Sequence, residues 1–326
     1  PVTVEGQGRR TETATSPVDG YVVSRAATGS KTDTPLLETP HSISVVPRDQ
    51  IAEQNAQTLN QVVRYTPGVT PETRRAVATR YDQLTIRGFD ARMYWNGMKQ
   101  QDLWYISPQL DPYLLERVEV LRGPTSVLYG QAPAGGMINQ VSKRPLDTPL
   151  REVGVEGGTH NHYRVTADFS DALDSRRDFH YRFTAVGLSE DGQVRMTENE
   201  RVAFAPSVTW RADDDTSLTL FGLYQNDPKG NSYGGIPPQG TVLPSPFGKL
   251  PVDFYDGDPN FEKFFREQQA LGYEFDRRLS DIWTLRLNGR GQRTTLAYDS
   301  VYANGVQADG RTLNRGTASS REALNA

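Results

Sequence analysis

Apolar and polar residues alternate with a period of two over most of the chain beyond residue 150. Trp283, Leu285 and Leu287, for example, alternate with polar residues, and the segments 202–210 and 217–224 repeat the pattern. Successive side chains of a strand point to opposite faces, so this alternation predicts strands with one apolar face. We expect about seven antiparallel strands. They are predicted at 150–158, 161–170, 178–189, 201–211, 216–226, 264–277 and 281–298.

The connections between these strands differ in length. Those near 171–177, 212–215 and 278–280 are short and polar, whereas 190–200 and 227–263 are longer. Short turns at one end and long loops at the other are typical of a transmembrane β-barrel. A soluble up-and-down barrel has the same alternation, but rarely a connection as long as 227–263. The pattern therefore favours the membrane barrel and leaves the soluble one open.

Residues 36–148 have a different, mixed pattern. Strands are predicted at 42–46, 84–87 and 117–121, and a helix follows the capping-box spacing of Thr58 and Gln61. Asp111 and Pro112 are typical of a second helix start. Residues 1–35 are rich in Thr, Gly and Ser, and predict a flexible arm. The expected domains are thus 1–35, 36–148 and 149–326.

Composition excludes several classes of protein. No apolar run reaches the ~18 residues of a membrane-spanning helix, and a net charge of -4 gives no sign of nucleic-acid binding. Cysteine is absent, which excludes disulfides and thiolate metal sites. No nucleophile, metalloprotease or phosphate-loop motif occurs, so we expect neither an enzyme nor a cofactor. His160, His162 and Asp213–Asp215 are interpreted as surface turns rather than metal ligands.

Three stretches resemble the TonB-dependent siderophore receptors, and most closely those for hydroxamates such as ferrichrome. The first combines TPHSISVV at 39–46 with YTPGV at 65–69, and the second is IRGF at 86–89. The third is the run from DPY at 111–113 through ERVEVLRGP at 116–124, VLYG at 127–130 and GGMIN at 135–139 to VSKRP at 141–145. Together they cover nearly all of 36–148.

The resemblance implies an α+β plug domain followed by the first strands of a transmembrane β-barrel with about 22 strands in full. About seven strands cannot close such a barrel. We therefore expect the chain to be the incomplete N-terminal half of a receptor, with the remaining strands beyond residue 326.

The resemblance also implies a site for the ferric siderophore. Trp104 and Tyr105 match an aromatic pair at the plug apex, and Tyr233 matches a tyrosine of the barrel wall. Arg74 or Arg75 corresponds to an arginine that hydrogen-bonds the ligand. The family's tryptophan is replaced by Gly235, and the loop 90–93 is short, so the identity of the siderophore stays open.

Two further sets of residues follow from the resemblance. Arg87 and Arg122 correspond to arginines that pair with barrel glutamates and hold the plug. Val2, Thr3 and Val4 resemble a TonB box, a β-favouring segment that can add a strand to a partner's sheet.

The function implied is uptake of a ferric siderophore across the outer membrane of a Gram-negative bacterium. The implied partners are TonB with its inner-membrane energising complex, the siderophore and outer-membrane lipid or lipopolysaccharide, and we expect a monomer. A receptor for haem or a cobalamin is the alternative within transport. A passive porin-like barrel is the alternative outside it.

Overall fold

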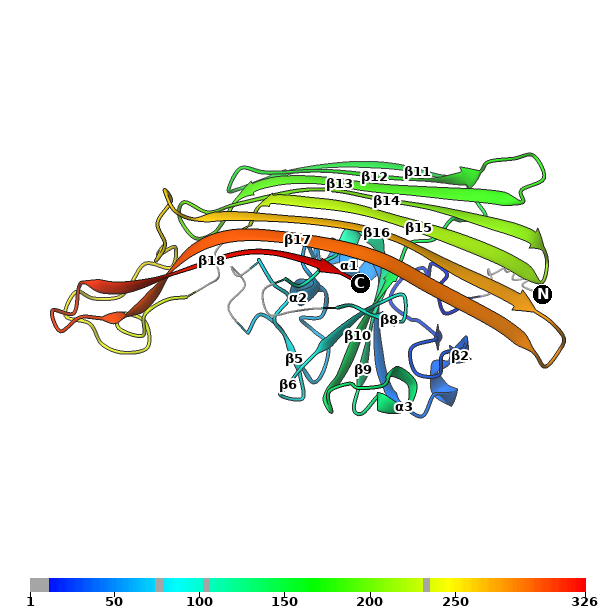
Figure 1. The fold of residues 1–326 in the computed structure, drawn as a ribbon, viewed down its shortest axis with the longest axis horizontal. Coiled ribbons are helices and arrows are strands. Elements are labelled where there is room, and N and C mark those ends of the chain that lie inside the picture. The colour runs from blue at the N-terminus through cyan, green and yellow to red at the C-terminus, as the bar shows by residue number, and fades with distance from the viewer. Residues whose placement is uncertain (1–11, 74–78, 102–105, 231–234) are drawn as a thin grey trace, which may run out of the picture. The chain divides into compact units, whose positions relative to one another are not determined.

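The computed structural model describes residues 12–73, 79–101, 106–230 and 235–326. The chain forms two compact units (Figure 1). Among the described residues, the first contains 12–71, 84–100 and 115–144, and the second contains 72–73, 79–83, 101, 106–114, 145–230 and 235–326. In this division, two segments of the expected plug domain group with the later strands.

The first unit is built on a five-stranded sheet in the order β3-β9-β10-β7-β8, with two smaller sheets, β1-β2 and β4-β5-β6. Its strands are β1 (Arg25–Ala26), β2 (Thr34–Pro35), β3 (Ser42–Pro47), β4 (Val69–Thr70), β5 (Thr85–Ile86), β6 (Phe89–Asp90), β7 (Arg92–Trp95), β8 (Met98–Lys99), β9 (Leu115–Arg122) and β10 (Gly136–Ser142). Its helices are η1 (Leu36–Glu38), α1 (Arg48–Glu53), α2 (Leu59–Val62) and α3 (Ser126–Tyr129). The strands β3 and β9 confirm the predictions for 42–46 and 117–121.

Local signals explain the short helix α2. The Thr58 hydroxyl accepts a hydrogen bond from the Gln61 amide at 3.3 Å, as the capping spacing predicts. Leu59, Val62 and Val63 are buried on one side of the helix. The strand predicted at 84–87 is only the two-residue β5, because Arg87 and Gly88 have positive φ values and turn the chain.

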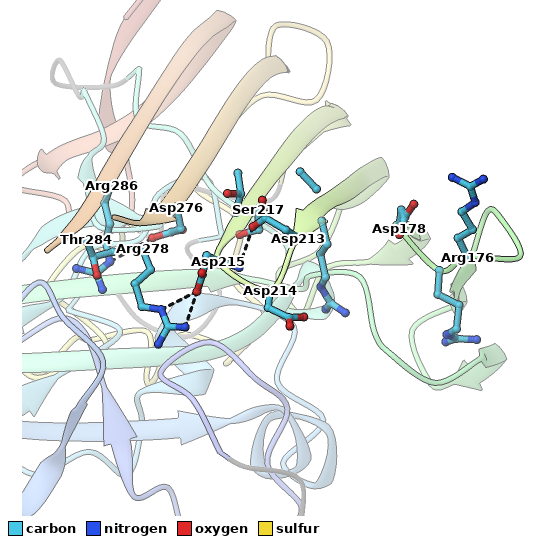
Figure 2. A pocket seen from close by; sticks show the side chains of 14 residues that line it. Arg176, Asp178, Asp213, Asp214, Asp215, Ser217, Asp276, Arg278, Thr284 and Arg286 are labelled. Atoms are coloured by element: carbon cyan, nitrogen blue, oxygen red, sulfur yellow. Dashed lines mark hydrogen bonds and ion pairs between the residues drawn. The ribbon is translucent and has the colours of Figure 1, made fainter. Parts of the chain in front are cut away.

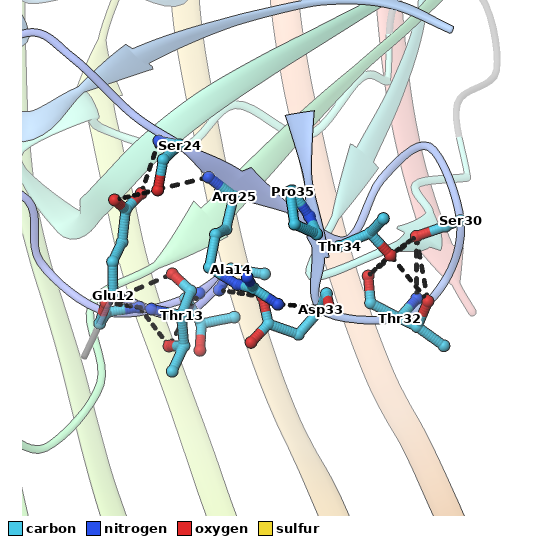
Figure 3. A network of polar contacts seen from close by, with 12 residues as sticks. Glu12, Thr13, Ala14, Ser24, Arg25, Ser30, Thr32, Asp33, Thr34 and Pro35 are labelled. Atoms are coloured by element: carbon cyan, nitrogen blue, oxygen red, sulfur yellow. Dashed lines mark hydrogen bonds and ion pairs between the residues drawn. The ribbon is translucent and has the colours of Figure 1, made fainter. Parts of the chain in front are cut away.

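Residues 12–35 are not the unstructured arm that the sequence predicts. The Asp33 carboxylate accepts hydrogen bonds from the Ala14 amide at 3.0 Å and from the Arg25 guanidinium at 2.8 Å (Figure 3). Fully buried Arg117 of β9 donates to the carbonyls of Thr13, Ser16 and Arg25. A polar, glycine-rich composition concealed these contacts, because the partners are distant in sequence.

The second unit is an eight-stranded antiparallel sheet in sequential order (Figure 1). Its strands are β11 (Leu150–Gly158), β12 (His162–Ala172), β13 (Phe179–Asp191), β14 (Glu198–Asp213), β15 (Thr216–Lys229), β16 (Lys263–Arg278), β17 (Thr284–Val306) and β18 (Leu313–Asn325). The first seven confirm the predicted strands. The eighth was missed because small and polar residues such as Gly316, Ala318 and Ser320 weaken its alternation.

The burial of this sheet is the reverse of that in a soluble protein. On β12 and β13 every buried position except Val186 is polar, including Arg164, Asp168 and Arg182, whereas Val165 and Phe183 are exposed. We call these the polar face and the apolar face of the sheet. The alternation predicted from sequence is present, and the apolar side faces outward.

Aromatic rings line up along the apolar face. Phe179 stacks on Trp210 with ring centres 6.2 Å apart, and Phe204 stacks between Phe183 and Tyr224. Within the described ranges, no helix is both long and apolar enough to cross a membrane.

Candidate functional site

Most of the ligand and partner residues predicted from sequence lie outside the described ranges. They are Val2, Thr3, Val4, Arg74, Arg75, Trp104, Tyr105 and Tyr233. The structure therefore does not test whether these residues lie close to one another. It does describe the residues that immediately follow two of these stretches, 79–83 and 106–114, which we call the two anchored segments.

Arg87 and Arg122 are neighbours in the first unit. Arg122 donates to the hydroxyls of Ser42 at 3.0 Å and Ser44 at 2.7 Å, and to the Pro67 carbonyl at 3.2 Å. Burial and the positive charge of Arg87 lower the pKa of the Arg122 guanidinium. Among the described residues, no carboxylate forms an ion pair with either arginine.

The polar face carries a cluster that sequence reasoning missed. Asp111, from the second anchored segment, accepts hydrogen bonds from Arg164 of β12 and Arg201 of β14, each at 3.1 Å. Arg201 also pairs with Asp227 of β15 at 2.6 Å, and Asp227 pairs with Arg266 of β16 at 2.7 Å. We call these five residues the arginine–aspartate cluster.

Four of the five side chains in this cluster are almost completely withdrawn from solvent. Asp111 is 1% exposed, and Asp227 and Arg266 are 2% exposed. A buried charge is tolerated only when it is paired and hydrogen-bonded. The alternating order of cations and anions meets that requirement, and fixes Asp111 against strands β12 and β14. A signal was available in sequence, since charged residues occupy inward positions of alternating strands.

Asp82 adds a further acid beside this cluster. Its Oδ1 atom is buried without a hydrogen-bond partner among the described residues. Burial raises the pKa of the Asp82 carboxyl to about 6, although the charges of Arg266 and Arg201 oppose that change.

Apolar contacts hold the second anchored segment as well. Ile106 packs against Phe264, Leu296 and Tyr298 from β16 and β17. Farther along, Asp111 accepts a hydrogen bond from the Tyr113 amide at 3.0 Å at the start of the 3-10 turn η2 (Pro112–Leu114). The helix predicted after Asp111 is thus a single turn, because the chain enters β9 at Leu115.

A charged pocket of about 630 Å³ lies at the short-turn end of the sheet (Figure 2). Arg278 pairs with Asp215 at 2.6 Å, and Arg286 pairs with Asp276 at 3.1 Å. Asp213 accepts a hydrogen bond from the Asp215 amide at 2.9 Å, which closes the turn between β14 and β15. The triple aspartate is therefore a charged turn, as the sequence indicates.

The histidine pair occupies the hairpin between β11 and β12. His160 has a φ of 59° in the turn, whereas His162 begins β12 and its Nδ1 lies 2.8 Å from Glu190. Within the described ranges, no group of three or more histidines and carboxylates is arranged to hold a metal ion.

Comparison with known proteins identifies the family. Residues 35–137 match the TonB-dependent receptor plug domain. The chain is 41% identical over 314 residues to the ferrichrome outer membrane transporter/phage receptor of Escherichia coli K12, covering 94% of this chain and 42% of that protein. It is 34% identical over 330 residues to the ferrioxamine receptor of Yersinia enterocolitica, covering 99% of this chain and 46% of that protein.

A solved structure shares the fold. The ferripyoverdine receptor of the Pseudomonas aeruginosa outer membrane, bound to ferripyoverdine, superposes with a TM-score of 0.86 at 20% identity, covering 97% of this chain and 42% of that one. The chain spans less than half the length of the curated relatives it matches. The chain has an α+β plug fold and a partial barrel sheet of eight antiparallel strands, and it belongs to the family of TonB-dependent siderophore receptors.

Proposed function

We propose that the protein containing this chain is an outer-membrane receptor that takes up a ferric siderophore of the hydroxamate type. The observation that carries the proposal is the similarity, over nearly the whole chain, to proteins named as ferrichrome and ferrioxamine receptors. Both ligands are hydroxamates. The reversed burial of the eight-stranded sheet supports a position in the outer membrane of a Gram-negative bacterium, because an apolar face has to meet lipid.

Recognition of the ligand is assigned to Arg74, Arg75, Trp104, Tyr105 and Tyr233. A ferric siderophore is bulky and already holds its iron. Its receptor needs aromatic faces and hydrogen-bond donors rather than metal ligands, and tryptophan, tyrosine and arginine supply both. The proposed function therefore requires no resident cofactor, and the ligand is transported without chemical change.

Transport against a gradient needs energy, which TonB and its inner-membrane complex supply in this proposal. Val2, Thr3 and Val4 form the contact, by adding a strand to the partner. Arg87 and Arg122 are assigned to pairs with glutamates outside this chain, and their neighbouring like charges favour an anionic partner. Outer-membrane lipid surrounds the apolar face, and the receptor acts as a monomer.

The decisive experiment measures binding of ferrichrome, ferrioxamine B, haem and cyanocobalamin to the full-length receptor. We expect the two hydroxamates to bind and the other two ligands not to bind. Trp104→Ala and Tyr105→Ala should each weaken binding by about tenfold, the loss of one well-packed aromatic contact. Leu279→Ala, in a short turn of the sheet, is the control.

Two results would contradict the proposal. Binding of haem or the cobalamin in place of the hydroxamates would assign a different cargo. Solute flux that does not change on deletion of residues 36–148 would indicate a passive pore.

A further inference from the structure

One guanidinium of the sheet is bonded to both anchored segments. Arg266 of β16 donates to the carbonyl oxygen of Arg80 at 2.9 Å and to that of Ser107 at 3.4 Å. It also donates to the Gln109 side chain and forms the ion pair with Asp227. Arg80 lies five residues from Arg75, and Ser107 lies two residues from Tyr105.

Each segment has its own attachment to the sheet as well. The Arg80 guanidinium pairs with Glu262 at 3.1 Å and donates to Ser300 at 3.1 Å. The backbone of Gln109 exchanges two hydrogen bonds with the side chain of Gln268, at 2.9 Å and 2.7 Å. Loss of the Arg266 contacts would therefore leave both segments attached, but would remove a shared connection between them.

We propose that Arg266 is a positioning residue that couples the segment following Arg74 and Arg75 to the segment following Trp104 and Tyr105. The inference rests on the proposed function, because its effect on ligand affinity depends on the roles assigned there to Arg74, Arg75, Trp104 and Tyr105. A guanidinium suits this role, since its planar fork of donors reaches several acceptors at once, whereas the ammonium of lysine is a point charge. Buried pairing with Asp227 fixes the orientation of that fork.

The test is a double-mutant cycle in the full-length receptor with ferrichrome as the probe. Dissociation constants are measured for Trp104→Ala, for Arg74→Ala with Arg75→Ala, and for all three substitutions together. With Arg266 present, we expect the losses to be non-additive by about threefold or more. In the Arg266→Lys background, the losses of binding free energy from the two sites should be additive. The affinity for ferrichrome should itself fall about tenfold.

Arg201→Lys is the matched control. Arg201 shares Asp227 with Arg266 and belongs to the same cluster. Of the two anchored segments as described, its hydrogen bonds reach only the second, through Asp111. We expect the Arg201→Lys background to retain the coupling. Coupling that persists in Arg266→Lys, or that disappears equally in Arg201→Lys, would overturn the inference.

Hydrogen exchange separates this inference from the proposed function, since it needs no ligand. Backbone amides of both 79–83 and 106–111 should exchange faster in Arg266→Lys, whereas Arg201→Lys should affect 106–111 alone. Arg266→Gln is the second variant, should the lysine variant fold poorly. Unchanged exchange at 79–83 in both Arg266 variants would refute the coupling even if no hydroxamate binds. If the variants show the expected faster exchange but the receptor binds no hydroxamate, only the ligand assignment is refuted.

Discussion

Individual charged residues determine how the polar face is organised. Arg164, Asp227 and Arg266 are buried at strand positions where a soluble sheet would place leucine or valine. Burying any one of these charges without a partner would destabilise the folded protein through desolvation. The ion pairs of the arginine–aspartate cluster offset that loss. Ion pairs have a fixed geometry, so they hold a segment in one position along the sheet. An apolar contact has no preferred direction and would not fix that position.

Asp111→Asn should destabilise the second unit strongly. Arg164 and Arg201 would then face each other without their shared anion, which costs about 3 kcal/mol for a buried pair that loses one partner. Denaturant unfolding of the refolded receptor measures the change. Asp214→Asn, in the exposed turn between β14 and β15, should change the free energy of unfolding by less than about 0.5 kcal/mol. Equal effects of the two substitutions would contradict the structural role of the cluster.

Asp82 should make stability depend on pH. Burial raises the pKa of its carboxyl to about 6 in the folded chain, above the ordinary value of 3.8. The folded state therefore holds the proton more tightly than the unfolded state, so stability falls as the pH rises from about 4 to about 6 and is constant above that. The free energy of unfolding lost over this pH range is of the order of 2–3 kcal/mol.

Asp82→Asn should remove this part of the pH profile. The difference between wild type and variant, measured by unfolding at pH 4, 5, 6 and 7, should grow in favour of the variant and then level off. A difference that is the same at pH 4 and pH 7 would show that Asp82 does not titrate in this range.

At the scale of elements, close backbone approach fixes the sheet of the first unit. Strand β10 pairs with β9 in antiparallel register and with β7 in parallel register. Gly136 opens β10 with a φ of 135°, and a Cβ atom there would lie 2.0 Å from the Leu121 carbonyl oxygen. Glycine is required at this position both for conformation and for space.

Gly136→Ala should disrupt the pairing of β9 and β10 and cost more than about 4 kcal/mol, because the obstructing atom belongs to the backbone and cannot rotate away. Limited proteolysis and hydrogen exchange of 115–142 report the change. Gly187→Ala in β13 is the control, since a Cβ atom there meets no heavy atom within 4 Å. Protection of 115–142 that survives Gly136→Ala would show that the strands can separate locally at little cost.

At the scale of the whole molecule, the two faces of the eight-stranded sheet separate two environments. Leu271, near the middle of β16, is 76% exposed on the apolar face. Exposure of so many large apolar side chains would promote aggregation in water, and is normal for a surface in contact with lipid. The aromatic stacks on this face strengthen the same interpretation.

Leu271→Arg should therefore reduce the stability of the full-length receptor in lipid bilayers by about 2–4 kcal/mol, the cost of an arginine near the bilayer centre. Folding into phosphatidylcholine vesicles, followed by heat-modifiable migration on gels, measures this loss. Leu279→Arg, in the turn between β16 and β17, should cost less than about 1 kcal/mol. If both substitutions are tolerated equally, the apolar face does not contact lipid.

Much of the fold could be predicted because its signals are local. The two-residue period located seven of the eight strands, and the Thr58 cap located α2. Strand β18 was missed because its small polar residues give no period, and the packed segment 12–35 was missed because its partner Arg117 lies far along the chain. The arginine–aspartate cluster was missed for the same reason, as Asp111 and its arginines are more than 50 residues apart.

The sequence by itself determined the family, the order of the two kinds of structure and the alternation of the strands, because motifs and periodicity are properties of neighbouring residues. Only the tertiary structure decided which side of each strand is buried and which charges meet. Alternation is symmetric: it separates two faces without indicating which one faces outward. That choice depends on what the rest of the chain places against the sheet, as Arg266 demonstrates by contacting both anchored segments.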